Sequence, residues 1–116
     1  MQHYKQLLLE KLENDGWELV EIDDETDWWL DEFWTIKSTR QKWGYELKVL
    51  FLVNPGYEGH VSNSPVWELV AVEQVPDDRP IGDFGFATID LHRGRFDKQL
   101  ALFTNQLDNY RNKLHD

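Results

Sequence analysis

The stretch that decides the fold is GYELKVLFLVN, residues 44–54. Its first half alternates apolar residues with Glu46 and Lys48, and this two-residue period is typical of a β-strand with one buried face. Leu50 and Leu52 then add apolar side chains on the second face, so we expect the far half of the strand to be covered on both sides. The Asn-Pro-Gly sequence at its end predicts a turn.

Other segments on either side of this stretch have the composition of strands. Residues 17–22 are short, rich in large apolar residues and bounded by turn-forming or charged residues. Residues 29–38 and 66–75 alternate apolar side chains between two faces. Residues 84–91 are compatible with a short strand or with an irregular segment. The sequence therefore predicts a sheet of four or five strands.

Helical periodicity marks both ends of the chain. Apolar residues at helical spacing between residues 4 and 12 predict a first helix, which the glycine of Asn14-Asp15-Gly16 ends because it tolerates the left-handed conformation. A stripe with steps of three and four residues predicts a longer second helix. Its apolar members are Phe96, Leu100, Phe103, Leu107, Tyr110 and Leu114.

The order of these elements predicts one α+β domain spanning residues 1–116. The connections between strands are too short for helical crossovers, so the strands should form an antiparallel meander. The N- and C-terminal helices then cover one face of a curved antiparallel sheet. The alternative is a plain two-layer α/β sandwich without a cleft.

The charge and the cysteine content exclude several classes of partner and site. A formal net charge of −10 argues against a nucleic-acid partner and against an anionic membrane surface. The absence of cysteine excludes disulfides and thiolate metal sites, and it fits a cytoplasmic location. The first residues lack the features of a signal peptide, and no apolar run is long enough to span a membrane.

The segment from residue 21 to residue 34 combines many carboxylates with an unusual density of tryptophan. Adjacent residues of a strand point to opposite faces, so either Trp28 or Trp29 is exposed unless the sheet is covered on both sides. Exposed indoles often mark binding sites. We therefore select Trp28, Trp29, Asp31 and Trp43, the last beside a predicted turn, as candidate binding residues. The alternative is that the tryptophans fill the core and the acidic loop is merely solvated.

No catalytic, metal or cofactor motif is complete. Asp23, Glu25 and Asp27 match the first ligand positions of an EF-hand loop, but Trp28 and Trp34 stand where its glycine and its bidentate glutamate belong. The four histidines lack a metal-ligand spacing, and there is no nucleophile elbow or phosphate loop. We therefore predict no catalytic residue, no metal and no cofactor.

Three segments carry a resemblance to a known group of proteins. WWLDEFWTIKS, ELKVLFLVNP and VWELVAVEQVPDDRP, within residues 17–80, resemble small cyanobacterial proteins of unknown function with a cystatin-like fold. The resemblance implies a helix packed against a curved antiparallel sheet and a cytoplasmic location. It implies no catalytic residues.

Three functions remain open from the sequence. The first is a non-catalytic interaction domain whose acidic, tryptophan-rich surface binds a protein with a basic surface. The second is a small-molecule pocket or modest enzyme, in which Tyr45, Trp67, Asp90 and His92 line a cleft between helix and sheet. The third is an immunity-type neutraliser of a basic protein. A homodimer is also plausible, because the sheet has exposed edges.

Overall fold

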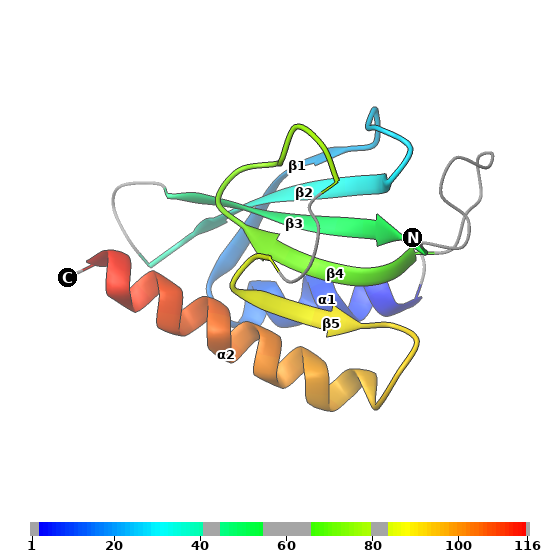
Figure 1. The fold of residues 1–116 in the computed structure, drawn as a ribbon. Helices are drawn as coiled ribbons and strands as arrows, with labels where there is room; N and C mark the ends of the chain where they lie inside the picture. The colour runs from blue at the N-terminus through cyan, green and yellow to red at the C-terminus, as the bar shows by residue number, and fades with distance from the viewer. Residues whose placement is uncertain (1–2, 41–44, 55–65, 80–83, 116) are drawn as a thin grey trace.

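The computed structural model describes residues 3–40, 45–54, 66–79 and 84–115. Two helices flank a five-stranded sheet in which each strand pairs antiparallel with the next along the chain (Figure 1). The elements are α1 (His3–Asn14), β1 (Trp17–Asp23), β2 (Leu30–Ser38), β3 (Glu46–Val53), β4 (Val66–Val72), β5 (Ala87–Asp90) and α2 (Phe96–His115). The predicted α+β meander with terminal helices is confirmed, in its five-stranded form.

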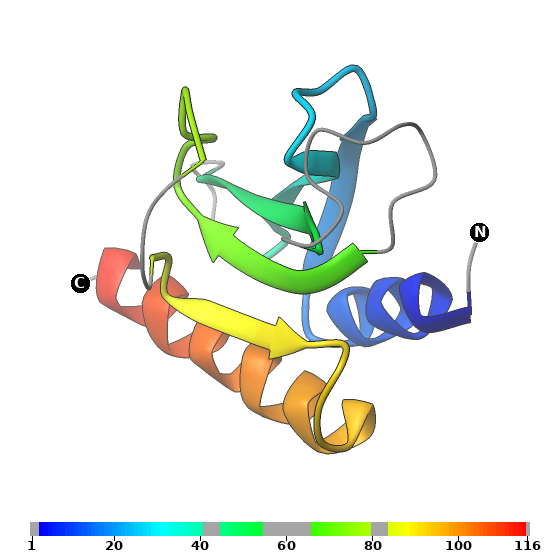
Figure 2. The same cartoon turned by 45° about the vertical axis from the view of Figure 1, so that its right-hand side comes forward.

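Both helices lie on one side of the sheet, which curves over them (Figure 2). The side chains on this face alternate along the strands as the sequence predicted, and they form the larger core with the inward side of each helix. The sheet contributes Trp17, Trp34, Ile36, Leu47, Val49, Phe51, Leu69, Ala71, Ala87 and Ile89; the helices contribute Leu8, Leu12, Leu100, Phe103 and Leu107. Burying one such large side chain contributes roughly 1.5–3 kcal/mol, so the helices and the sheet stabilise each other mainly through this face.

The opposite face carries a second, smaller core over the middle of the sheet. Leu50, Leu52, Val70 and Val72 point to this side and are buried beneath Trp29 and Leu30. Partly buried Phe33, Val75 and Phe84 pack around them. The expectation that the far half of the central strand is covered on both sides is therefore confirmed.

The ends of three strands differ from the sequence prediction. β2 begins at Leu30 and β4 ends at Val72, whereas the apolar pattern had included Trp29 and Val75. Both of these side chains pack into the second core from segments outside the strands, so their apolar character reflects burial and not strand pairing. β3 is also shorter than predicted, because Tyr45 lies before the strand and is half-exposed.

The turn between α1 and β1 depends on one glycine. Gly16 has a φ angle of 86°, which only glycine adopts without strain. Its carbonyl accepts a hydrogen bond of 2.9 Å from the Thr39 backbone N–H, and a Cβ atom here would lie 2.6 Å from Nε of Arg40. The absence of a side chain at Gly16 therefore leaves room for the side chain of Arg40 to pass over the turn.

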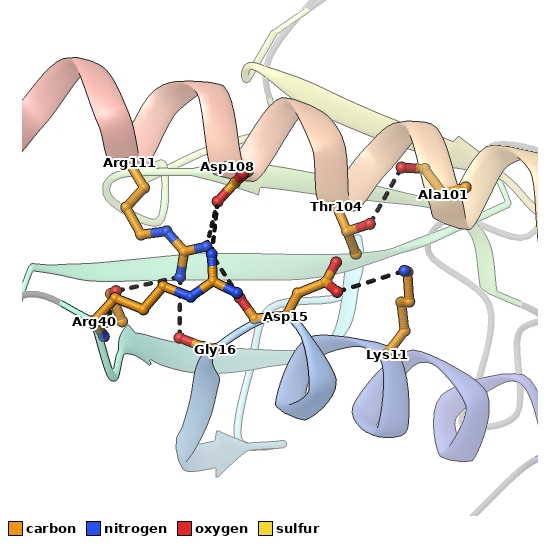
Figure 3. A network of polar contacts seen from close by, with 9 residues as sticks. Lys11, Asp15, Gly16, Arg40, Ala101, Thr104, Asp108 and Arg111 are labelled. Carbon is orange, nitrogen blue, oxygen red and sulfur yellow. Dashed lines mark hydrogen bonds and ion pairs between the residues drawn. The ribbon is translucent and has the colours of Figure 1, made fainter.

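Arg111 of α2 fastens this turn to the last helix (Figure 3). Its buried guanidinium donates to the carbonyl oxygens of Asp15 and Gly16, each at 3.0 Å, to the Ser38 hydroxyl at 3.3 Å, and to the Asp108 carboxylate. The guanidinium carbon also lies 4.5 Å from the centre of the Trp17 ring. One planar, permanently charged group thus joins α1, β1, β2 and α2.

Replacing Arg111 with methionine should lower the free energy of unfolding by roughly 2–4 kcal/mol, because two backbone carbonyls lose a charged donor and water cannot replace it easily. The matched control is Arg95→Met. Arg95 contacts Asp97 through two hydrogen bonds of 3.2 and 2.9 Å, but both side chains are exposed. An exposed pair of this kind contributes little to stability, because water and salt screen it. Urea titrations of the two variants that gave equal losses would contradict the role assigned to Arg111.

Candidate interaction surface

The connection between β1 and β2 forms an acidic hairpin, defined here as residues 21–32. Hydrogen bonds within the loop hold it together. The Asp23 carboxylate accepts a hydrogen bond of 3.0 Å from the Glu25 N–H, and the Leu30 N–H donates at 3.0 Å to the Asp27 carbonyl. The Thr26 hydroxyl donates to the carbonyl of Leu30. Short-range hydrogen bonds of this type hold a polar loop in one shape without a buried core of its own.

The two adjacent tryptophans of this loop face opposite environments. Trp28 is 57 % exposed, whereas Trp29 is 2 % exposed and covers the second core. The Trp29 carbonyl accepts a hydrogen bond of 3.0 Å from the Val53 N–H, which ties this residue to the end of β3. The structure therefore leaves Trp28 available to a partner and places Trp29 inside the protein.

Trp34, the third indole of the segment, is a core residue. Its ring is fully buried and lies 5.0 Å from the ring of Phe51, measured between centroids. Its indole N–H donates a hydrogen bond of 3.0 Å to the Glu32 carboxylate. A buried indole whose N–H is hydrogen-bonded packs stably, so Trp34 helps to hold Glu32 of the hairpin against the core.

A buried lysine neutralises the base of the acidic hairpin. The ammonium group of Lys5, on α1, contacts the Glu32 carboxylate and lies 3.5 Å from an Asp31 oxygen. It also lies 5.0 Å from the centre of the Phe51 ring. The sequence does contain an indication that Lys5 is buried. Lys5 precedes Leu8 and Leu12 at helical spacing, which places it on the buried stripe of α1.

The remaining carboxylates of the hairpin face solvent. Glu21, Asp24, Glu25 and Asp27 are exposed, and within the described residues none of them forms an ion pair with a lysine or arginine. The hairpin thus has a base, where Lys5 neutralises carboxylates, and an outer rim, where the carboxylates are exposed. Trp28 lies within this rim.

The other two candidate binding residues have different outcomes. Asp31 is partly exposed but shares Lys5 with Glu32, so its carboxylate also serves the contact between α1 and β2. Trp43 lies outside the described residues. Of the two candidate tryptophans that the structure describes, Trp28 is the exposed one.

The structure separates the residues proposed to line a cleft. Trp67 and His92 do meet, with stacked rings whose centroids are 3.7 Å apart, and Asp90 lies close by at the end of β5. Tyr45 precedes β3 at the opposite end of the β3–β4 pair. The space between the helices and the sheet is filled by fully buried side chains such as Trp34, Phe51 and Phe103.

Two depressions lie at the surface of the described residues. A groove of about 530 Å³ runs between α1 and α2, and its walls are mostly polar. It is lined by Lys11, Asp15, Arg40, Ala101, Leu102, Thr104, Asn105 and Asp108. A second hollow of about 390 Å³ lies beside β5 and includes Glu68 and Asp90. Neither lies in the space between the helices and the sheet.

The comparisons with known proteins give no relative. No protein-family model, no curated protein and no solved structure matches this chain. The resemblance to small cyanobacterial proteins therefore stays a prediction. Within the described residues, no group of three or more histidines or carboxylates is placed to hold a metal ion, and neither helix has the length and apolar character that crossing a membrane requires.

Tyr4 of α1 lies beside the Lys5 network and carries a buried hydroxyl that has no hydrogen-bond partner among the described residues. Burial, and then the charges of Asp31 and Glu32, raise the pKa of this phenol far above its usual value. The folded protein therefore keeps Tyr4 protonated under conditions where the unfolded chain ionises it. The stability that this difference contributes is fully present below about pH 10 and is lost as the pH rises further.

We expect Tyr4→Phe to unfold less readily than the wild type above pH 10, because the substitution removes the ionisable group. At pH 7 the variant should equal or exceed the wild type in stability, since no hydrogen bond is lost and an unpaired buried hydroxyl is removed. Urea titrations between pH 7 and pH 11 measure both effects. Parallel loss of stability in the two proteins would contradict the assignment.

Proposed function

We propose that this chain is a non-catalytic protein-binding domain that recognises a basic partner through the acidic hairpin. The observation that carries the proposal is Trp28, a large indole held in solvent among carboxylates that have no cation partner within the described residues. Leaving an indole in water is unfavourable, and side chains of this type dominate the energy of many protein interfaces.

The two components of the hairpin suggest separate contributions to binding. The indole of Trp28 would supply contact area that is lost from water on association. The carboxylates at positions 24, 25 and 27 would attract Lys and Arg, which raises the rate of encounter and selects basic partners. A rigid loop reduces the entropy lost on binding, and the internal hydrogen bonds of this loop provide that rigidity.

Other functions receive less support. A small-molecule pocket under the sheet conflicts with the fully buried side chains that fill this space. An immunity-type neutraliser is a special case of our proposal, in which the basic partner is a toxin or nuclease. We further propose a cytoplasmic location, which the absence of cysteine supports.

Trp28→Ala should reduce capture of the partner from lysate of the source organism by roughly tenfold or more, the loss typical of a central interface residue. The matched control is Leu102→Ala, because Leu102 is 58 % exposed but lies on α2. Quantitative pull-down with the tagged wild type and both variants measures the effect. Equal recovery of the same partner by all three proteins would overturn the assignment of the surface.

Charge is tested separately by the triple variant Asp24→Asn, Glu25→Gln and Asp27→Asn. It should weaken capture and flatten the dependence on salt between about 0.05 M and 0.5 M NaCl, because screening acts on the removed charges. Glu10→Gln, Glu13→Gln and Glu73→Gln remove the same number of exposed carboxylates elsewhere and should leave capture nearly unchanged. Equal effects of both triple variants would mean that net charge alone governs binding.

A further inference from the structure

The free edge of β1, defined here as residues 20–23, has no second strand beside it among the described residues. β1 is the first strand of the sheet and pairs only with β2 in the part of the chain that the structure describes. Alternate backbone N–H and C=O groups of an edge strand point away from its neighbour. Within the described residues, no backbone hydrogen bond from elsewhere reaches residues 20–23.

Both apolar side chains of this edge are exposed. Val20 is 49 % exposed and Ile22 is 42 % exposed, although the cross-strand neighbour of Ile22 is the fully buried Trp34. Figure 2 shows the reason: β1 rises away from α1 as it leaves the first turn, so the helix covers Trp17 and not the far half of the strand. Two apolar side chains therefore border an unpaired backbone.

Charge decides which occupant fits this edge. In an antiparallel pair of two copies, Glu18, Glu21 and Asp23 of one chain would meet the same carboxylates of the other, and like charges across strands are destabilising. In a partner segment whose alternate residues are Lys or Arg, the cationic side chains would lie beside the same carboxylates and attract them.

We propose that the free edge of β1 binds an extended basic segment of the partner, which adds to the sheet as a sixth strand. This inference rests on the proposed function and specifies how the partner is held. Backbone hydrogen bonds to residues 20–23 supply the pairing, apolar side chains of the segment pack on Val20 and Ile22, and its Lys or Arg residues face Glu18 and Glu21.

The probe is the capped hexapeptide Lys-Val-Lys-Val-Lys-Val, added to the ¹⁵N-labelled full chain. We expect the amide hydrogens of residues 20–23 that face away from β2 to exchange roughly tenfold more slowly at saturating peptide, because they become hydrogen-bonded. The same peptide methylated on every backbone nitrogen keeps its charge and its side chains but cannot pair as a strand. It should bind at least roughly tenfold more weakly.

Matched variants of the chain separate the edge from net charge. Val20→Lys with Ile22→Lys should abolish binding of the peptide. Leu7→Lys with Leu102→Lys adds the same charge at two exposed leucines on the helices and should retain it. Circular dichroism of both double variants checks that each remains folded.

Several results would overturn the inference. Equal binding of the methylated peptide, or binding that leaves exchange at residues 20–23 unchanged, would exclude strand addition. Slow exchange at these residues that depends on protein concentration without peptide would show that a second copy occupies the edge. Absence of binding at millimolar peptide would also refute it. None of these results alters the Trp28→Ala capture experiment, which tests the proposed function by itself.

Discussion

The way in which α2 docks on the first turn depends on the burial of one guanidinium group. Arg111 can remain charged inside the protein only because the carbonyls of Asp15 and Gly16, the Ser38 hydroxyl and the Asp108 carboxylate surround it. These acceptors exist in the right place only if α1 ends before the turn at Gly16 and β2 ends beside that turn. The arginine thus specifies how the end of α2 docks on the first turn, in addition to the apolar contacts that drive docking.

The acidic residues of this chain perform two different tasks. Glu32 is bound by Lys5 and by the indole of Trp34, and it connects α1 to β2. Asp24, Glu25 and Asp27 lie only a few residues earlier and are left to solvent. A strongly negative composition therefore does not mark every carboxylate as a surface feature. The position of the buried lysine separates the structural carboxylates from those that can meet a partner.

Periodicity predicted the fold well because it reports burial directly. The alternation from Leu47 to Leu52 and the stripe from Phe96 to Tyr110 both appear in the structure on the expected faces. The side chain of Leu114, the last member of the predicted stripe, lies outside the described part of the chain. Strand ends were less accurate, because Trp29 and Val75 are buried outside the ladder. For the candidate surface, the sequence selected Trp28 and Trp29 together. Only the turn from Asp27 to Leu30, with the bond from Val53 to Trp29, determines which indole is buried.

Polar contacts across long separations could not be read from the sequence at all. Lys5 and Glu32 are 27 residues apart, and the sequence around neither residue indicates that the two side chains are in contact. Arg111 is 73 residues from Ser38 and 95 residues from Gly16. A cation on a buried stripe needs an acceptor, but the identity of that acceptor depends on which strand the helix covers, and this is a property of the assembled tertiary structure.

The meander has a consequence for the order in which the protein is completed during synthesis. Every pair of neighbouring strands is also consecutive along the chain, so each hairpin can form soon after its second strand leaves the ribosome. The last helix is different, because Arg111 reaches back 95 residues to Gly16. Until α2 has emerged, the helix-facing side of β5 stays open to water, and the nascent chain exposes an apolar surface that a chaperone can bind.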